Sequence, residues 1–287
     1  MQGAAASVLS GSVSGAPSSN DEVWALLSDT HLAADSTTSK KGVNMAANLK
    51  RTVAQVLKVG QKPYGVMING DCAYLDGQEG DYLALAQALQ PLRDHAVQVH
   101  LTLGNHDDRT KFRAALSGPQ DEPPLENKHV AVLSSARMNW VLLDSLNVVN
   151  QVSGLLGDEQ LGWLDRALRN APAKPTAVMV HHNPGPFEIQ GNKVSGLEDT
   201  EPLFQVLAKH RKKVFALFYG HTHNWSVTKD EKTGIHLVNL PPVAYTFKED
   251  RPSGWVVARM SPKGLELELK SLNPNHPEHR QKVLLEV

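Results

Sequence analysis

Five short polar clusters hold the side chains of this chain that are best suited to chemistry. They are Asp29-Thr30-His31, Gly70-Asp71, Gly104-Asn105-His106-Asp107, His181-His182-Asn183-Pro184 and Gly220-His221-Thr222-His223, and six of the 13 histidines fall inside them. Carboxylate oxygens and imidazole nitrogens are donor atoms for transition-metal ions such as Mn²⁺, Fe, Co²⁺ and Zn²⁺. The only cysteine, Cys72, excludes a cage of several thiolates. The clusters therefore indicate a metal site built from nitrogen and oxygen ligands.

Two of the clusters share a spacing that suits metal binding. Asp29 and His31, and again His221 and His223, are separated by a single residue. Because alternate side chains of an extended segment point to the same side, both members of each pair can reach one ion. Glycine, which permits sharp turns, comes directly before three of the candidates: Asp71, Asn105 and His221.

Each cluster taken alone also has a purely structural explanation. Asp29 could occupy a turn or cap a helix, and Asn105 and Asp107 could be turn residues after a glycine. His181 and His182 could be buried histidines held by hydrogen bonds. Alternating histidines at the end of a strand have few structural uses, however, and all five clusters occur together. Their combination favours a common site over five unrelated structural roles.

The elements that must position these clusters follow an alternating pattern. Short β-branched or apolar runs alternate with longer amphipathic stretches, which predicts an α/β fold. We expect strands at residues 23–27, 65–68, 97–103, 130–133, 139–143, 177–180, 214–219, 235–240, 254–260 and 265–270, and helices at residues 43–59, 82–89, 158–168 and 201–210. The last three strands follow without helices, which predicts a largely antiparallel portion. Every polar cluster follows a predicted strand, and the carboxyl ends of strands are where α/β sheets bind ligands.

Together the five clusters resemble the calcineurin-like metallophosphoesterase superfamily, over about residues 23–260. The resemblance implies a four-layer α/β/β/α double-sheet sandwich with a centre for two divalent transition-metal ions, either Mn, Fe, Zn or Co. It assigns one ion to Asp29, His31 and His223. It assigns the other ion to Asn105, His181 and His221, with Asp71 bridging the two. His182 is expected to point away from its neighbour and to serve as a structural or supporting residue.

The charge of such a centre suits the hydrolysis of phosphate esters. Two divalent ions bring four positive charges, whereas Asp29 and Asp71 return only two negative charges. Paired ions about 3.5–4 Å apart generate hydroxide near neutral pH and stabilise both the attacking and the departing oxygen. We expect hydrolysis of a phosphodiester or a phosphomonoester, with His106 as the catalytic residue that contacts the phosphoryl group or protonates the leaving oxygen.

Differences from the motifs of individual groups narrow down which members of the superfamily the chain resembles. Protein Ser/Thr phosphatases carry an acid and an arginine shortly after the bridging aspartate, which this chain lacks. Gly70-Asp71-Cys72-Ala73-Tyr74 matches an element of purple acid phosphatases, but those enzymes lack the histidine found here as His31, so Tyr74 is expected to pack rather than bind iron. The segments 221–225 and 238–243 resemble bacterial members that include class III cyclic-nucleotide phosphodiesterases.

Two other classes of function compete with this hypothesis. One is a binding scaffold of the same fold without catalysis, although such proteins usually lack some ligands. The other is a metal-dependent nuclease, but the formal net charge of -1 and the missing basic stripe give no sign of nucleic-acid binding. The expected partner is a small phosphate ester, with no nucleic acid and no membrane anchor, and the oligomeric state is not indicated.

The chain is expected to divide into three parts. Residues 22–272 form the metallophosphoesterase domain, and residues 273–287 form a C-terminal tail whose polar first half is held loosely at the surface. Residues 1–21 are rich in Ala, Ser and Gly and form either a flexible leader or the remnant of an export signal. The second alternative predicts a periplasmic or exported protein, and the first a cytoplasmic one.

Overall fold

The first strand of the fold packs its side chains into two hydrophobic core clusters, one on each face of its sheet. The computed structural model describes residues 21–116, 124–189 and 191–287, and strand β1 (Glu22–Ser28) is buried along its whole length. Val23, Ala25 and Leu27 pack into one apolar cluster, while Trp24 and Leu26 pack into another. Successive side chains of a strand point to opposite faces, so a strand with an uninterrupted apolar sequence requires a covering layer on both sides.

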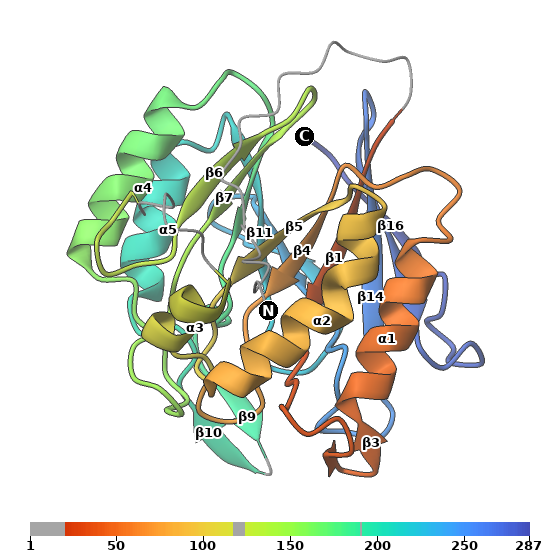
Figure 1. Cartoon of the computed structure of the whole chain (residues 1–287). Coiled ribbons are helices and arrows are strands. Elements are labelled where there is room, and N and C mark those ends of the chain that lie inside the picture. Colours follow the sequence, from red (N-terminus) through yellow and green to blue (C-terminus); the bar gives the residue numbers. More distant parts are fainter. Residues whose placement is uncertain (1–20, 117–123, 190) are drawn as a thin grey trace.

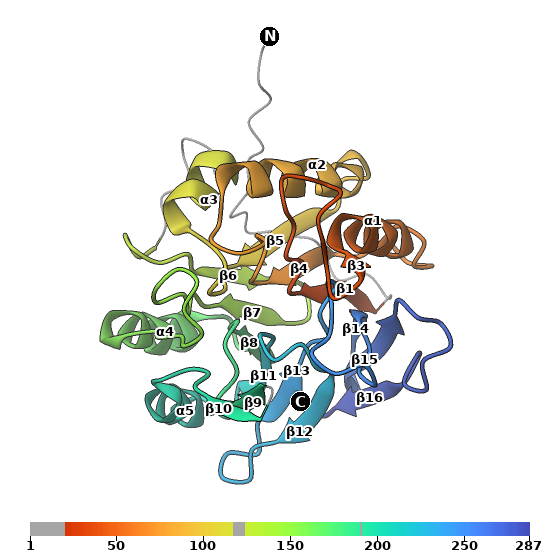
Figure 2. The same cartoon turned by 90° about the horizontal axis from the view of Figure 1, so that it is seen from below.

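The sheet that contains β1 has six strands in the order β16 (Lys282–Leu285), β15 (Gly264–Ser271), β14 (Gly254–Ser261), β1, β4 (Gly65–Asn69) and β5 (Gln98–Thr102). Strands β1, β4 and β5 are parallel, and β14, β15 and β16 continue the sheet in antiparallel fashion. Helices α1 (Met45–Val56), α2 (Glu79–Asp94) and α3 (Arg109–Leu116) cover its outer face (Figure 2).

The second sheet has the order β12 (Ser226–Lys229), β13 (His236–Asn239), β11 (Val214–Tyr219), β8 (Thr176–Met179), β7 (Asn139–Leu142) and β6 (Ala131–Ser134). Its four inner strands are parallel, and its two edge strands are antiparallel to their neighbours. Helices α4 (Asp158–Asn170) and α5 (Thr200–Lys209) cover its outer face (Figure 1). Two small hairpins complete the fold, β2 (Ser39–Lys40) with β3 (Val43–Asn44) and β9 (Phe187–Ile189) with β10 (Asn192–Val194).

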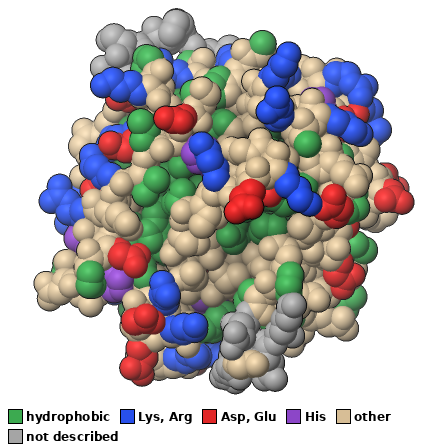
Figure 3. Space-filling model, turned by 180° about the vertical axis from the view of Figure 1, so that it is seen from behind, with side chains coloured by type: hydrophobic (Ala, Val, Ile, Leu, Met, Phe, Trp, Pro, Cys, Tyr) green, Lys and Arg blue, Asp and Glu red, His purple; other side chains and the backbone are tan. Residues whose placement is uncertain are grey.

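Large aromatic side chains fill the space between the two sheets. Trp24 of the first sheet lies 6.0 Å from Trp140 of the second, measured between ring centroids, and Trp140 lies 5.0 Å from Phe218. All three side chains are buried. The predicted four-layer α/β/β/α sandwich is therefore confirmed, with helices outside and the two sheets packed against each other inside (Figure 2). On the face seen from behind, acidic and basic side chains are interspersed (Figure 3).

Several predicted elements differ from the observed ones. Helix α1 begins at Met45 rather than at residue 43, because the Asn44 side chain accepts a hydrogen bond from the backbone amide of Ala47 and caps the helix. Helix α2 does not stop before Pro91 but continues through it, since Leu92 is buried in the same core as the earlier turns. The predicted antiparallel portion is correct for β14 and β15 but wrong for β13, which pairs in parallel with β11.

The end of the chain also differs from the prediction. Residues 273–287 do not form a tail outside the domain, because β16 pairs with β15 and Leu285 is fully buried between the sheets. The amide of Arg280 donates a hydrogen bond to the carbonyl of Leu269, which ties the preceding turn to the same sheet. The predicted leader, residues 1–21, lies almost entirely outside the described residues. Within those residues, no helix combines the length and apolar character of a membrane span.

Candidate metal centre

The five polar clusters meet at one edge of the sandwich. Three of them follow β1, β4 and β5 of the first sheet, and two follow β8 and β11 of the second. Hydrogen bonds link the loops across the seam between the sheets. The side-chain amide of Asn69 donates to the carbonyl of Val180 at 3.0 Å, and the backbone amide of His221 donates to the carboxylate of Asp29 at 3.2 Å. Residues separated by up to 194 positions in the chain are therefore brought to a common point.

A first group of possible ligands comprises Asp29, His31, Asp71 and His223. His31 Nε2 lies 3.0 Å from His223 Nε2 and 3.6 Å from Asp71 Oδ2, and His223 Nε2 lies 3.4 Å from Asp29 Oδ1. One donor atom from each of the four residues falls within 4.8 Å of all the others, and all four side chains are buried. Two carboxylates and two imidazoles converging at this distance have the chemistry of a divalent metal site.

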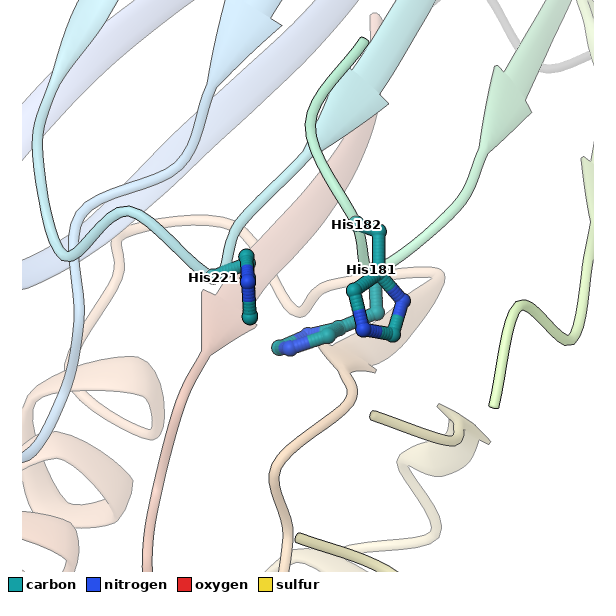
Figure 4. A group of neighbouring side chains, drawn as sticks. All are labelled: His181, His182 and His221. Carbon is teal, nitrogen blue, oxygen red and sulfur yellow. The ribbon is translucent and has the colours of Figure 1, made fainter. Parts of the chain in front are cut away.

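A second group lies on the other side of Asp71. His181 Nε2 is 3.3 Å from Asp71 Oδ2, and the ring centroids of His181 and His221 are 5.1 Å apart (Figure 4). The buried atoms without a hydrogen-bond partner among the described residues include Asn105 Oδ1, His181 Nε2, His182 Nε2 and His221 Nε2. Burying a polar atom without a partner is costly, so the three histidines, whose donor atoms lie within 4.8 Å of one another, fit a bound cation. Asp71 thus belongs to the first group and also contacts His181 of the second group.

His182 does not point away from its neighbour, contrary to the sequence-based expectation. Its ring centroid lies 5.0 Å from that of His181 and 4.6 Å from that of His221, and Figure 4 shows the three side chains together. The geometry of the expected extended strand does not apply because β8 ends at Met179, before both histidines. His182 Nδ1 is 2.7 Å from Ser145 Oγ, whereas His182 Nε2 is buried and has no hydrogen-bond partner among the described residues.

Backbone carbonyls fix the orientation of three of the imidazole rings. In each case Nδ1 faces a carbonyl oxygen, which selects the tautomer with a proton on Nδ1 and a free lone pair on Nε2. The pairs are His31 with Tyr74, His181 with Asn69, and His223 with Tyr245. The Nε2 atoms that face the two groups are therefore prepared to act as ligands.

The backbone of the candidate ligands is unusual as well. Nine residues other than glycine have positive φ in the described chain, and five of them are candidate ligands. Left-handed backbone at such residues is uncommon and is concentrated at functional sites. The five are Asp29, His31, Asp71, His221 and His223. The surrounding hydrogen bonds hold these loops in conformations that the sequence would not otherwise prefer.

The glycines in these loops have a second role that the sequence did not reveal. Gly70 has φ +67° and makes the expected turn, but Gly104 and Gly220 do not have positive φ. A Cβ atom at Gly104 would lie 2.2 Å from Asp71 Oδ1 and 2.7 Å from His181 Nε2. A Cβ atom at Gly220 would collide with Ser28 Oγ and lie 2.6 Å from Asp29 Oδ2. Close packing against candidate ligands therefore requires glycine at both positions.

Burial and neighbouring charges set the protonation of the centre. Burial lowers the pKa of His31 to about 3 and lowers the pKa of His221 well below its usual value, which keeps both rings neutral. Burial would also lower the pKa of His181, but the charge of Asp71 outweighs it and raises the pKa to about 9. Burial would raise the pKa of Asp29, yet His223 lowers it on balance. A bound cation would take the place of the proton between His181 and Asp71.

Asp107 organises the centre without facing it, a role that the sequence analysis missed. Its carboxylate accepts hydrogen bonds from the amides of Gly104, Cys72 and Ala73 at 2.9–3.1 Å, and from the hydroxyl of Tyr82. It therefore joins the loop after β4 to the loop after β5. Burial, together with the negative charge of Asp71, raises the pKa of Asp107 to about 6. The only sequence signal was its place beside His106 in a polar cluster.

A cavity of about 260 Å³ opens above the ligands. His106 lies in its wall with its ring centroid 5.1 Å from that of His31, and its Nδ1 faces the carbonyl of Leu75. Lys40 and Lys41, which were not singled out from the sequence, line the same cavity. Tyr74 packs in a small apolar cluster beneath the β2–β3 hairpin, in keeping with the expectation that it packs.

Comparisons with known proteins agree with this geometry. The family model for calcineurin-like phosphoesterases matches residues 24–225. The 3′,5′-cyclic adenosine monophosphate phosphodiesterase CpdA of Pseudomonas aeruginosa is 31% identical over 199 residues, covering 69% of this chain and 68% of the relative. The glycerophosphodiester phosphodiesterase GpdQ of Enterobacter lignolyticus is 27% identical, covering 79% of this chain and 80% of the relative.

Solved structures share the fold at low sequence identity. A dimetal phosphatase from Danio rerio superimposes with a TM-score of 0.68 at 15% identity, covering 93% of this chain and 99% of that one. The purple acid phosphatase PPD1 from yellow lupin superimposes with the same TM-score and identity, covering 92% of this chain and 53% of that one. The family match spans most of the chain and includes all seven candidate ligands. The chain therefore belongs to the calcineurin-like phosphoesterase family.

Proposed function

We propose that this metal-dependent phosphoesterase hydrolyses a small phosphodiester at the edge where the two sheets meet. The observation that carries the proposal is the position of Asp71. Its carboxylate lies 3.6 Å from His31 Nε2 on one side and 3.3 Å from His181 Nε2 on the other. A single carboxylate that faces two groups of buried donor atoms is suited to bridge two ions.

The residues divide naturally between two ions. Asp29, His31 and His223 would hold the first ion, and Asp71 would face both. The second ion would be held by Asn105, His181 and His221, each of which has a buried side-chain atom without a hydrogen-bond partner among the described residues. Two bound divalent ions would acidify water and neutralise charge on the phosphoryl oxygens. The nitrogen and oxygen donors suit Mn, Fe, Co or Zn, and do not select one of them.

His106 is the residue of this chain best placed to act on the ester itself. It lines the cavity, belongs to neither ligand group, and is kept in place by two contacts. Its backbone amide donates to Asp71 Oδ1 at 2.9 Å, and its Nδ1 lies 2.5 Å from the carbonyl of Leu75. Because Nδ1 donates to this carbonyl, a proton on Nε2 makes the ring an imidazolium, which can donate a hydrogen bond to a phosphoryl oxygen or pass the Nε2 proton to the departing oxygen.

Two features support a diester over a monoester. The relatives described above are named as phosphodiesterases, one of cyclic adenosine monophosphate and one of glycerophosphodiesters. A second cavity of about 360 Å³ adjoins the first, and both are lined by His223 and Phe247. A diester carries substituents on both sides of phosphorus, and two adjoining cavities can accept them. A folded scaffold without catalysis is the alternative, but every donor type of a two-ion centre is present in the described residues.

The test measures bound metal and turnover in the same samples. The protein is loaded with Mn²⁺ and assayed with bis(p-nitrophenyl) phosphate, and metal is counted by mass spectrometry. Wild type is expected to bind two ions per chain, and Asp71→Asn is expected to lose turnover at least about 100-fold with loss of metal. Asp158→Asn, at the exposed start of α4, is the matched control. An Asp71→Asn protein with wild-type metal content and turnover would refute the proposal.

His106 is tested separately, because it is not expected to bind metal. His106→Gln should keep both ions and lose about 10²–10⁴-fold in turnover of an ester with a poor leaving group. The loss should be smaller for an activated aryl diester, whose leaving group needs less protonation. Unchanged turnover of both esters with metal bound would remove His106 from the reaction.

A further inference from the structure

We propose that the β2–β3 hairpin is an anion-selecting element, which makes the preferred substrate a phosphodiester whose substituent carries a second negative group such as a carboxylate or a phosphate. The inference rests on the proposed phosphoesterase function and names its substrate class. It is carried by Lys40 and Lys41, two adjacent cations in the wall of the cavity above the candidate metal ligands.

Aromatic rings place both lysine side chains close to the metal centre. Lys40 Nζ lies 5.7 Å from the ring centroid of Tyr245, and this ring lies 4.9 Å from that of His223. Lys41 Nζ lies 5.5 Å from the ring centroid of Phe247, which is stacked on His223 at 4.2 Å. Each ammonium is therefore one aromatic ring removed from a metal ligand. It is positioned for a part of the substrate beyond the scissile phosphate.

No acidic side chain in the described part of the chain forms an ion pair with either of these two cations. Among the ion pairs of the described residues, none includes Lys40 or Lys41. Lys40 is also 5.6 Å from the ring centroid of Tyr74, so its ammonium lies over two aromatic rings. Cation–π contacts orient an ammonium but leave its charge available to an anion. Two oriented and unpaired cations in one cavity wall are a site for a negative group.

The hairpin that carries the lysines is held firmly. Lys40 pairs with Val43, and the two-residue turn between them has positive φ at both positions, 53° at Lys41 and 75° at Gly42. Val43 packs in the apolar cluster that includes Tyr245. A bound anion would therefore meet lysines whose backbone is already fixed, which reduces the entropy lost on binding.

The conformation of Lys41 is a second argument for function. A two-residue turn with positive φ at both positions favours Asn-Gly, and a lysine at its first position is conformationally less favourable. Residues held in such conformations point to a functional hypothesis rather than to stability. If the turn served only to close the hairpin, Asn at position 41 would serve better. This difference allows the structural and the functional role of Lys41 to be separated by experiment.

The test uses two diesters that differ only in one charge. Both release p-nitrophenol, and the other substituent is either 4-carboxybenzyl or its neutral isostere 4-carbamoylbenzyl. Wild type is expected to prefer the carboxylate by about tenfold in kcat/KM at low salt, and 0.5 M NaCl should shrink the preference because it screens exposed charges. In Lys40→Gln/Lys41→Gln the preference should fall towards one.

Two further variants serve as controls. Lys263→Gln removes the same charge from the β14–β15 turn and should keep the preference for the carboxylate. This turn is far from the metal centre, because Met260 pairs with Glu22 at the opposite end of β1. Lys41→Asn should keep or raise the melting temperature while the preference falls. Loss of stability with an intact preference would assign Lys41 a purely structural role and overturn the proposal.

The outcomes also separate this inference from the proposed function. Equal kcat/KM for the two diesters in wild type would overturn the anion-selecting role while leaving the phosphoesterase intact. Absence of turnover of both diesters with metal bound would instead contradict the proposed function. Isothermal titration calorimetry with the corresponding pair of non-hydrolysable phosphonates still decides the role of the hairpin in that case. Tighter binding of the carboxylate, lost in the double variant, supports it, and equal dissociation constants refute it.

Discussion

Replacing Gly104 with alanine would test whether the close approach of the loops after β4 and β5 is needed for the centre. The added Cβ would lie 2.2 Å from Asp71 Oδ1, 2.5 Å from the amide nitrogen of Asp71 and 2.7 Å from His181 Nε2. Favourable contacts of a carbon atom are near 3.5–4.0 Å, so Asp71 and His181 must move by roughly 1 Å. These are the residues that connect the two groups of donors.

The size of the expected loss in activity follows from this displacement. A misplacement of about 1 Å in a catalytic centre can reduce turnover about 100-fold, so Gly104→Ala should lose at least that much kcat/KM and bind less than two ions per chain. Overpacking a buried site costs about 1–3 kcal/mol of unfolding free energy. For a chain of this size, each 1 kcal/mol lowers the melting temperature by about 2–4 °C. The protein should therefore remain folded at 25 °C.

The assay combines turnover of bis(p-nitrophenyl) phosphate, metal counting and thermal unfolding. Gly162→Ala is the matched control, because Gly162 lies within α4 and its added Cβ would meet only the end of the Arg166 side chain, at 3.4 Å. Alanine there should raise stability by about 0.5–1 kcal/mol and leave turnover unchanged. If Gly104→Ala binds two ions and keeps wild-type kcat/KM, the packing argument is wrong.

Three further predictions concern stability. Burial lowers the pKa of His100 to about 4, so the unfolded chain binds a proton more readily between pH 6.5 and 4. The free energy of unfolding should therefore fall by at most about 3 kcal/mol as the pH is lowered through that window. Urea unfolding of His100→Gln should show a weaker dependence on pH, and the same pH dependence in wild type and variant would contradict this. Leu285→Ala should lower the free energy of unfolding by about 2–5 kcal/mol because Leu285 is fully buried, whereas Leu284→Ala, at an exposed site, should change it by less than about 0.5 kcal/mol. Equal effects of the two substitutions in denaturant titrations would contradict the packing of β16 into the core. Arg109→Met should cost about 3 kcal/mol or more, because it leaves the fully buried carboxylate of Asp144 without its ion pair; a change below 1 kcal/mol would show that the backbone amides around Asp144 suffice.

The fold class and the meeting of the polar clusters at one edge could be predicted from the sequence, because both depend on local signals. Apolar runs marked most strands of the two sheets, and each polar cluster began where a strand ended. The positions of Asp29 and Asp71, for example, follow directly from the ends of β1 and β4. The expected grouping of the candidate ligands came from the family resemblance, because spacing alone did not determine it.

Features that depend on contacts between distant segments were not predicted. His182 was expected to point away, but the strand ends before it and its ring lies beside His221. Asp107 looked like a turn residue, and its role became visible only where three backbone amides from two loops meet its carboxylate. Pro91 suggested a helix end, yet burial of the next turn outweighs the lost hydrogen bond.

A crystal structure of the Mn²⁺-loaded protein, recorded at the manganese absorption edge, tests the central claim most directly. The account predicts two anomalous peaks roughly 3.5–4 Å apart, one beside His31 and His223, the other beside Asn105 and His221, with Asp71 between them. A single peak, or two peaks of which neither contacts Asp71, would contradict the account.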